Sequence, residues 1–307
     1  ARVVVLSRDP QRFAASAPHL AREAGIMFVR GDVQTLDARS VLDQLAESSP
    51  DQFAFVIHAA TEASAKLNSE NPLLMVDTIV QGTRAALDFA AAVGAKRFLL
   101  TSSGAVYGPQ PPHVTHVQED YLGAPDQTDT ASAYGEGKRL AELLCVCFAK
   151  QYSIEPALAR CFAFVGPFLP LDAHFAIGNF IRDAIRGGPI RVGGDGTPYR
   201  SYLYTADLAV WLWTMLVKAR ACRPYNVGSS EELNIGEIAE QVRTEVCPEA
   251  VVDIAQQPRA GGVPGRYVPA TDRAERELGL RSRVSLGDAI RRTARYARDE
   301  ASTATHR

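Results

Sequence analysis

Tyr134 and Lys138 lie four residues apart in the segment SAYGEGKRLAE, which has the composition of a helix start. At that spacing their side chains can share one helical face. Free tyrosine has a pKa of about 10 and is a poor base near neutral pH, but a neighbouring cation favours its phenolate form. The pair therefore predicts a proton-transfer device in which Lys138 makes the Tyr134 phenol more acidic. The ordinary alternative is a surface pair on a helix.

Ser103 adds a hydroxyl to this pair. It ends the apolar run RFLLTSS, and the helix that carries Tyr134 and Lys138 follows that run in the chain. In open α/β sheets, ligands bind beyond the carboxyl ends of the strands. Moving a hydride onto or off a carbinol carbon requires a proton to move on its oxygen. We therefore expect Ser103 to orient that oxygen while Tyr134 exchanges the proton.

The elements that must position these residues alternate along the first half of the chain. Apolar runs with little alternation predict buried parallel strands. Helical stretches separate them, and the clearest are 72–93 and 132–152. This alternation predicts right-handed βαβ units and a Rossmann-like, doubly wound parallel sheet of the α/β class. The predicted strands are 2–7, 26–32, 53–60, 97–103 and 156–162.

After residue 163 the pattern changes to short strands and loops rich in Gly and Pro, interleaved with helices. We interpret residues 1–163 as a dinucleotide-binding domain. Residues 164–307 are predicted to form a smaller substrate-binding α/β lobe, with some segments crossing back to the first domain. The helices expected there are 174–187, 205–219, 234–246 and 285–299.

Composition narrows the class of protein. The formal net charge of −2 favours neither nucleic acid nor an anionic membrane as a partner. The longest apolar runs fall far short of the roughly 20 residues of a membrane span, and the chain opens on a strand-like run rather than a secretory signal. Five cysteines show no metal-ligand spacing, so we expect reduced thiols, no metal site and a cytoplasmic location.

Taken together, the motifs resemble the extended short-chain dehydrogenase/reductase family, in its nucleotide-sugar epimerase, dehydratase and reductase branch. The resemblance implies a nicotinamide cofactor, a nucleotide-diphosphate sugar as substrate, and a homodimer formed through helices 72–93 and 132–152. The matching motifs occur in family order: GDV, HAAT, TSSGAVYG, YGEGK, RCFAFVGP, RSYLYTADLA, YNVGS and TDRAERELG.

The resemblance also implies roles for single residues. Tyr134 resembles the catalytic tyrosine, Lys138 its partner, which also reaches the nicotinamide ribose, and Ser103 the active-site hydroxyl. Asp32 and Val33 would border the adenine, and Ala59 and Ala60 would pass beside the cofactor pyrophosphate. The candidate substrate contacts are Arg200 and Arg266 at the diphosphate and, at the start of a helix facing the crevice, His174 and Asn179. The alternative for the arginines is pairing with carboxylates. For His174 and Asn179 it is helix capping or packing.

The family's opening strand and Gly-x-x-Gly-x-x-Gly turn, which cradle the cofactor pyrophosphate, have no counterpart here. Residue 1 begins at what resembles the second strand. Neither RVGGDG (191–196) nor RAGGVPGR (259–266) clearly joins a strand to a helix, so neither replaces the turn. We therefore expect a further N-terminal segment of roughly 20–30 residues, the size of one βα unit.

A second departure concerns the choice of cofactor. An acidic residue normally ends the strand at 2–7 and binds the ribose 2′-hydroxyl of NAD. Here Ser7 and Arg8 stand at that end, and a hydroxyl followed by a cation suits a 2′-phosphate. We therefore expect NADP(H), with NAD(H) still possible if Asp9 folds back to the ribose.

A third departure concerns the reaction. Relatives that dehydrate a sugar carry Asp-Glu directly after the active-site hydroxyl, and related decarboxylases commonly keep the Glu. Gly104 and Ala105 stand there instead and cannot move a proton. We therefore favour reduction of a 4-keto sugar nucleotide, with C4 epimerisation as the alternative; 4,6-dehydration and a non-catalytic nucleotide-binding scaffold rank below both.

Overall fold

The structure is a computed structural model that describes residues 2–45, 53–61, 64–173 and 175–305. Its contacts divide the chain into two compact units. The first unit contains residues 1–102, 127–158 and 220–223, and the second contains residues 103–126, 159–219 and 224–307. The predicted domain boundary near residue 163 stays a prediction.

The strands predicted in the first half are present, each within three residues of its expected ends. They are β1 (Val3–Ser7), β2 (Ile26–Arg30), β3 (Phe55–His58), β4 (Arg97–Ser103) and β5 (Glu155–Cys161). β1 pairs with β2 and β3 pairs with β4, both in parallel register. A four-stranded sheet has the order β10-β5-β4-β3, with β10 at Pro224–Val227. The α/β class is confirmed.

The parallel strands form two sheets instead of one continuous sheet. β1 and β2 make a separate two-stranded sheet, and β3 is an end strand of the four-stranded one. Apolar side chains on these strands remain partly in solvent: Val3 is 38% exposed, Phe55 48% and Ile57 40%. The further N-terminal segment is not tested by the structure and stays a prediction.

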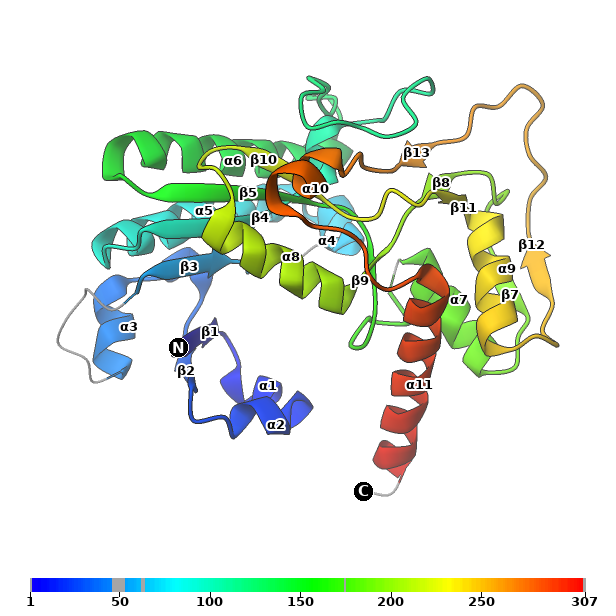
Figure 1. The fold of residues 1–307 in the computed structure, drawn as a ribbon, viewed down its shortest axis with the longest axis horizontal. Helices are drawn as coiled ribbons and strands as arrows, with labels where there is room; N and C mark the ends of the chain where they lie inside the picture. The colour runs from blue at the N-terminus through cyan, green and yellow to red at the C-terminus, as the bar shows by residue number, and fades with distance from the viewer. Residues whose placement is uncertain (1, 46–52, 62–63, 174, 306–307) are drawn as a thin grey trace. The chain divides into compact units, whose positions relative to one another are not determined.

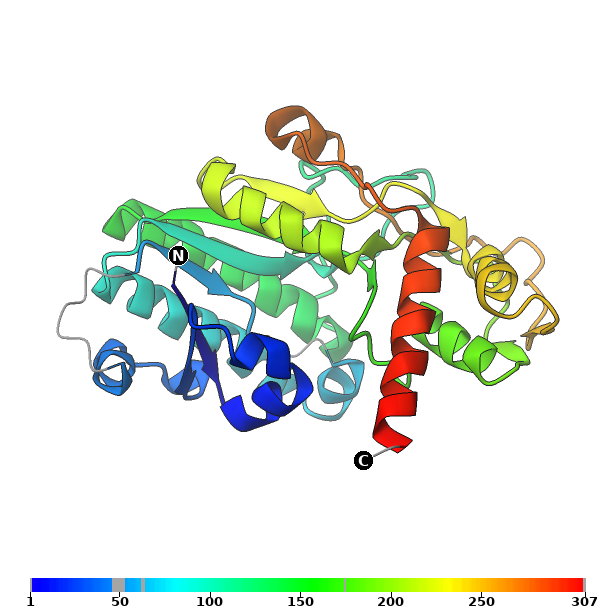
Figure 2. The same cartoon turned by 60° about the horizontal axis from the view of Figure 1, so that its bottom comes forward.

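Two long helices dominate the first unit, and their bounds match the prediction to within one residue. α5 (Pro72–Ala92) and α6 (Ala133–Tyr152) lie side by side along the strands in both Figure 1 and Figure 2. Asn71 caps α5 by accepting from the Leu74 amide, and Pro72 occupies its first turn. Gly137 permits the close approach, since a Cβ there would lie 3.0 Å from the Ile79 side chain.

Short elements complete the first unit, and a buried core lies against α5 and α6. The core includes Ile79 and Leu87 from α5, Phe98 from β4 and Cys145 from α6. The short elements are α1 (Pro10–Ser16), α2 (Pro18–Ala21), η1 (Val33–Thr35), α3 (Ala38–Gln44), α4 (Ala65–Glu70) and η3 (Thr130–Ser132).

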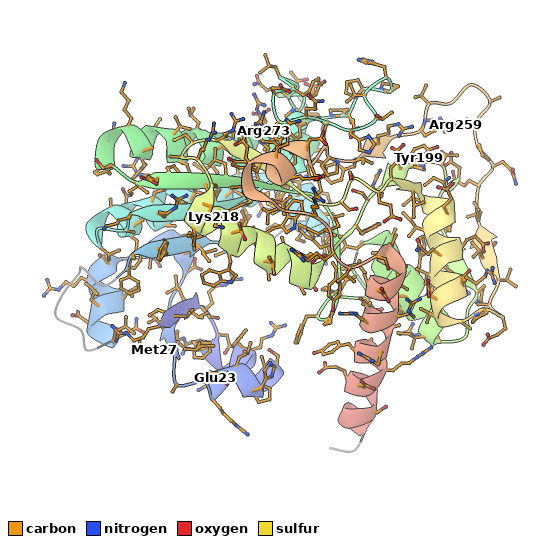
Figure 3. All side chains as sticks on the ribbon, in the orientation of Figure 1. Glu23, Met27, Tyr199, Lys218, Arg259 and Arg273 are labelled. Atoms are coloured by element: carbon orange, nitrogen blue, oxygen red, sulfur yellow. The ribbon has the colours of Figure 1, made fainter. Side chains whose placement is uncertain are left out.

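The second unit has its own core, built where α7 (Ala176–Ile185), α9 (Ile235–Val246) and α11 (Leu286–Thr305) meet. Figure 3 labels Tyr199 on β8 of this unit. No helix of the described residues is long and apolar enough to cross a membrane. The remaining elements are η2 (Gly104–Tyr107), β6 (Phe164–Val165), β7 (Ile190–Val192), β8 (Tyr199–Arg200), β9 (Leu203–Tyr204), α8 (Thr205–Lys218), β11 (Leu233–Asn234), β12 (Val252–Ile254), β13 (Arg266–Tyr267) and α10 (Asp272–Leu278).

Candidate active site

Lys138 lies deep in the first unit, with only 2% of its surface exposed. Its Nζ donates to the Thr101 carbonyl of β4 at 2.7 Å, which fixes the ammonium against the end of that strand. The Nζ atom lies 5.9 Å from the centre of the Tyr134 ring. A cation held near a phenol in a buried place is the arrangement that the Tyr-x-x-x-Lys spacing predicted.

Tyr134 stands in the first turn of α6, with its side chain half-buried. Its backbone amide donates to the side-chain Oδ1 of Asn68, on α4, at 2.9 Å. The sequence analysis did not single out Asn68, because the two residues are 66 positions apart and no local pattern links them.

The two serines at the end of β4 have different surroundings. Ser102 is buried and its hydroxyl donates to the Glu142 carboxylate of α6 at 2.6 Å, which makes it a structural residue. Ser103 is also buried, and its hydroxyl accepts from the Ala105 amide at 3.1 Å, capping η2. The second unit begins at Ser103. The predicted approach of the Ser103 hydroxyl to Tyr134 stays a prediction.

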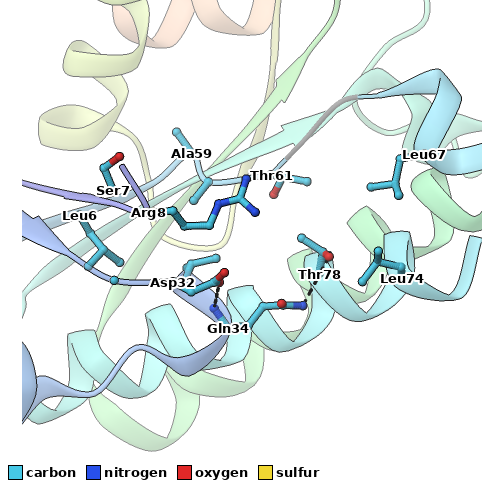
Figure 4. Close-up of a pocket in the computed structure, with 13 residues that line it drawn as sticks. Leu6, Ser7, Arg8, Asp32, Gln34, Ala59, Thr61, Leu67, Leu74 and Thr78 are labelled. Carbon is cyan, nitrogen blue, oxygen red and sulfur yellow. Dashed lines mark hydrogen bonds between the residues drawn. The ribbon is translucent and has the colours of Figure 1, made fainter. Parts of the chain in front are cut away.

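A cavity of about 580 Å³ opens within the first unit, at the carboxyl ends of β1, β2 and β3. Figure 4 shows its lining, and six residues predicted to hold the cofactor are part of it. Its volume is typical of a small-molecule or cofactor site. The predicted lining residues are Ser7, Arg8, Asp32, Val33, Ala59 and Ala60; those that the sequence analysis missed include Gln34, Thr61, Leu67, Leu74 and Thr78.

The end of β1 shows how the cofactor phosphate or ribose could be recognised. Ser7 and Arg8 line the cavity, and Figure 4 shows the Arg8 side chain extending across it toward Thr61. Asp9 does not line the cavity. Its carboxylate accepts from the Arg12 amide at 3.0 Å and caps α1.

A buried histidine directly precedes Ala59, which lines this cavity. His58 is the last residue of β3 and is 3% exposed. Its Nε2 lies 3.2 Å from the Thr83 hydroxyl. Burial, and secondarily the positive charge of Lys138, lower its pKa to about 4. His58 is therefore neutral at physiological pH and places no second positive charge beside Lys138.

The residue after Ser103 is closely packed within the second unit. A Cβ at Gly104 would lie 2.7 Å from a ring carbon of Phe162 and 2.8 Å from the Tyr267 hydroxyl. The Phe162 and Tyr267 rings contact each other at 4.7 Å between centres. These aromatic side chains fill the space that a carboxylate at position 104 would need.

A second cavity, of about 290 Å³, lies within the second unit. Asn179 and Phe180 of α7 face the segment Arg191–Gly196 across it. Asn179 is therefore placed at a cavity, as a substrate contact requires, whereas His174 lies outside the described residues. The sequence analysis judged RVGGDG only as a replacement for the cofactor turn and missed this role.

Arg200 and Arg266 lie on neighbouring strands, β8 and β13, which pair in parallel. The Arg266 guanidinium contacts the Glu232 carboxylate and lies 4.1 Å from the centre of the Tyr199 ring. Arg200 donates to the Tyr199 carbonyl at 2.7 Å. The structure thus brings the two arginines together, and Arg266 makes a carboxylate pair, which was the alternative to diphosphate binding.

Comparison with known proteins relates the chain to one family. A model described as "NAD dependent epimerase/dehydratase family" matches residues 1–228. UDP-glucuronic acid decarboxylase 1 of Arabidopsis thaliana is 33% identical over 77% of this chain, and decarboxylase 6 of the same plant is 34% identical over 76%. The chain spans 53% and 67% of these two relatives.

Solved structures share the fold over almost the whole chain. UDP-glucose 4-epimerase of Thermotoga maritima, determined with UDP-glucose, has a TM-score of 0.82 at 19% identity. The match covers 98% of this chain and 92% of the epimerase chain. A dTDP-glucose 4,6-dehydratase double mutant from Streptomyces venezuelae, with NAD and DAU bound, has a TM-score of 0.80 at 25% identity, with 98% and 89% covered. Both are Rossmann-type folds, as the strand pattern predicted.

Proposed function

Since the chain belongs to the NAD dependent epimerase/dehydratase family, we propose that it is a nucleotide-sugar oxidoreductase that reduces a 4-keto group. The proposed substrate class is a nucleotidyl 4-keto-deoxysugar. Relatives and similar structures that act on or contain UDP- and dTDP-sugars support the coarser assignment to nucleotide sugars.

In the proposed reaction, a nicotinamide cofactor held by the lining of the first cavity would supply the hydride that reduces C4 of the sugar. Tyr134 then gives its phenolic proton to O4, which completes the alcohol. Ser103 holds O4 by hydrogen bonding, and the Lys138 ammonium, fixed on the Thr101 carbonyl, stabilises the phenolate that remains. The phenolate takes up a proton from solvent before the next turnover.

The observation that carries this proposal is the absence of a proton-transferring side chain at Gly104 and Ala105, together with the packing around Gly104. Elimination of water from the sugar needs an acid and a base besides the Tyr134 phenol. Phe162 and Tyr267 leave no room for a carboxylate at position 104. Hydride transfer at C4 needs only the Ser, Tyr and Lys side chains, so we favour it over dehydration or decarboxylation.

For the cofactor we propose NADP(H), held in the cavity of the first unit. Ser7 and Arg8 line that cavity, and a guanidinium beside a hydroxyl matches a 2′-phosphate. The capping role of Asp9 further supports this choice, since its carboxylate is engaged with α1. The similar Streptomyces venezuelae structure contains NAD, which keeps NAD(H) as the alternative.

For the nucleotide end of the substrate we propose the second unit. Arg200 and Arg266 supply cationic groups on adjacent strands, and the cavity beside Asn179 and Arg191 has the size of a small ligand site. Arg266 would exchange Glu232 for the substrate diphosphate, which offers oxygens to both guanidinium edges.

The test is NADPH consumption by the purified protein in the presence of nucleotidyl 4-keto-6-deoxysugars. We expect one NADPH oxidised for each sugar reduced. Tyr134→Phe should lower kcat by about 10²–10⁴-fold, because the proton donor is removed, with cofactor binding retained. Turnover by Tyr134→Phe at nearly the normal rate would refute the proposed chemistry.

Epimerisation at C4 with NAD is the second candidate, because it also requires no carboxylate at Gly104 or Ala105. Interconversion of two nucleotide sugars with no net coenzyme use would identify it. Cofactor binding without turnover of any nucleotide sugar would instead identify a non-catalytic binder. We further propose a cytoplasmic homodimer that associates through α5 and α6.

A further inference from the structure

The side chain of Asn68 makes two hydrogen bonds to one turn of backbone at the start of α6. Its Oδ1 accepts from the Tyr134 amide at 2.9 Å, and its Nδ2 donates to the Ala131 carbonyl at 2.9 Å. A carboxamide offers one acceptor and one donor side by side, which matches this pair of backbone groups. Asn68 thus clamps residues 131–134 to α4.

The clamp supplies a side-chain cap, which α6 lacks from its own N-cap residue. The first amides of a helix have no partner within the helix and are usually satisfied by the side chain of the preceding residue. Ser132 occupies that position in α6 but makes no side-chain capping bond. Asn68, which is 66 residues away in sequence, satisfies the amide of Tyr134 instead.

Asn68 also joins Tyr134 to the wall of the cofactor cavity. Its neighbour Leu67 lines that cavity, as do Leu74 and Thr78 of α5. Ser64 caps α4 by accepting from the Leu67 amide at 3.1 Å, which fixes the start of this short helix. The backbone of Tyr134 is therefore tied to the same wall that would contact the cofactor.

We infer that Asn68 is a positioning residue for Tyr134, holding the first turn of α6 so that the phenol meets the sugar oxygen and the nicotinamide in register. The inference rests on the proposed role of Tyr134 as the proton-transfer group. Lys138 is fixed separately, through Thr101, so loss of the clamp would move the phenol relative to an ammonium that stays in place. Small errors of placement at a reacting group lower kcat strongly.

The experiment compares three variants with the wild type. Asn68→Leu keeps the shape and removes both hydrogen bonds, and Asn68→Asp keeps the acceptor for the Tyr134 amide. Ser69→Ala is the matched control, since Ser69 is the next residue of α4 and bonds only within its own turn, to the Lys66 carbonyl. For each variant, kcat, KM, the pH–rate profile and the thermal midpoint are measured with NADPH and a 4-keto sugar nucleotide.

For Asn68→Leu we expect kcat to fall between about 10-fold and 100-fold and its pH profile to shift, with KM within about twofold of the wild type. Asn68→Asp should recover most of the loss, and Ser69→Ala should behave as the wild type. An unchanged kcat and pH profile in Asn68→Leu would overturn the inference while leaving the proposed function intact.

Two measurements do not depend on turnover. Amide hydrogen exchange of the peptide containing Tyr134 should be faster in Asn68→Leu than in the wild type. Titration of the Tyr134 phenol, taken as the ultraviolet difference between each protein and its Tyr134→Phe counterpart, should also change. If the wild type turns over no nucleotide sugar, the proposed function fails. Unchanged exchange and an unchanged titration would then overturn the role of Asn68 as well.

Discussion

At the scale of single residues, the proposed preference for NADP(H) rests on the side chains at the end of β1. Arg8 and Ser7 line the first cavity, and the carboxylate of Asp9, the next residue, caps α1. A guanidinium gains a charge-assisted hydrogen bond from a 2′-phosphate and gains nothing comparable from a 2′-hydroxyl. Selectivity for NADP(H) should therefore depend on Arg8.

Replacing Arg8 with Gln tests this directly. Loss of one charge-assisted contact should raise the Kd for NADPH by about 10-fold to 100-fold and change the Kd for NADH by less than about twofold. Arg12→Gln, on the exposed surface of α1, is the matched control. Equal weakening of NADPH and NADH binding, measured by titration calorimetry, would contradict a phosphate-specific role.

A second prediction at this scale concerns His58 and acid stability. Burial lowers its folded-state pKa to about 4, below its ordinary value of 6.5. Between these pH values the unfolded chain binds a proton at His58 and the folded protein does not, so stability falls as the pH falls from 6.5 toward 4. Between pH 6.5 and pH 5, the free energy of unfolding should therefore fall by about 2 kcal/mol less in His58→Phe than in the wild type.

Urea unfolding at both pH values measures that difference. His113→Gln, at an exposed loop position, is the control and should keep the acid sensitivity of the wild type. If His58→Phe loses as much stability as the wild type on acidification, His58 does not carry this effect.

Among the elements, η2 and the loop after it depend on packing within the second unit. The Tyr107 hydroxyl donates to the Asn226 side chain at 2.7 Å, and Asn226 in turn donates to the Val117 and Ala270 carbonyls. Asn226 is fully buried. This network, with Gly104 against Phe162, fixes the backbone that follows Ser103.

Gly104→Ala should therefore destabilise the protein. Its Cβ would come within 2.8 Å of the Phe162 ring, and such overpacking costs about 1–3 kcal/mol. Adding Phe162→Leu to Gly104→Ala should recover part of the lost stability, because the smaller side chain leaves space for the new Cβ. Gly265→Ala, where a Cβ meets nothing within 4 Å, is the control. Denaturant unfolding that finds Gly104→Ala as stable as Gly265→Ala would show that the site is not closely packed.

At the scale of the whole molecule, the outer face of α6 predicts self-association. Leu140, Leu143 and Val146 are 42%, 56% and 40% exposed, and Leu73 at the start of α5 is 79% exposed. Exposed apolar residues gathered on one helix are typical of a protein interface. A second copy of the chain would bury them symmetrically.

Sedimentation velocity at micromolar concentration should show a dimer. Leu143→Glu should shift it to the monomer, because a charge placed in an apolar interface loses its hydration. Val251→Glu, at a position 68% exposed in the second unit, should leave the dimer intact. A wild-type chain that sediments as a monomer would refute the proposed interface.

The sequence by itself determined the class of fold and indicated which side chains could carry the chemistry. Strand and helix periodicity placed α5 and α6 to within one residue, since burial on one side of each element leaves a local pattern. Tyr134 and Lys138 were found for the same reason: their interaction is set by helical spacing. The residues at the ends of β1, β2 and β3 were expected from the family resemblance, which agrees with the rule that ligands bind at the carboxyl ends of strands.

Contacts between residues distant in sequence were decided only by the tertiary structure. Asn68 caps a helix that begins 65 positions later, the segment 191–196 faces Asn179 across a cavity, and Arg266 pairs with Glu232, 34 positions earlier. The separation of β1–β2 from the four-stranded sheet is of the same kind. These features depend on contacts between segments that are distant in sequence. Such contacts leave no periodic pattern of residue types in the sequence.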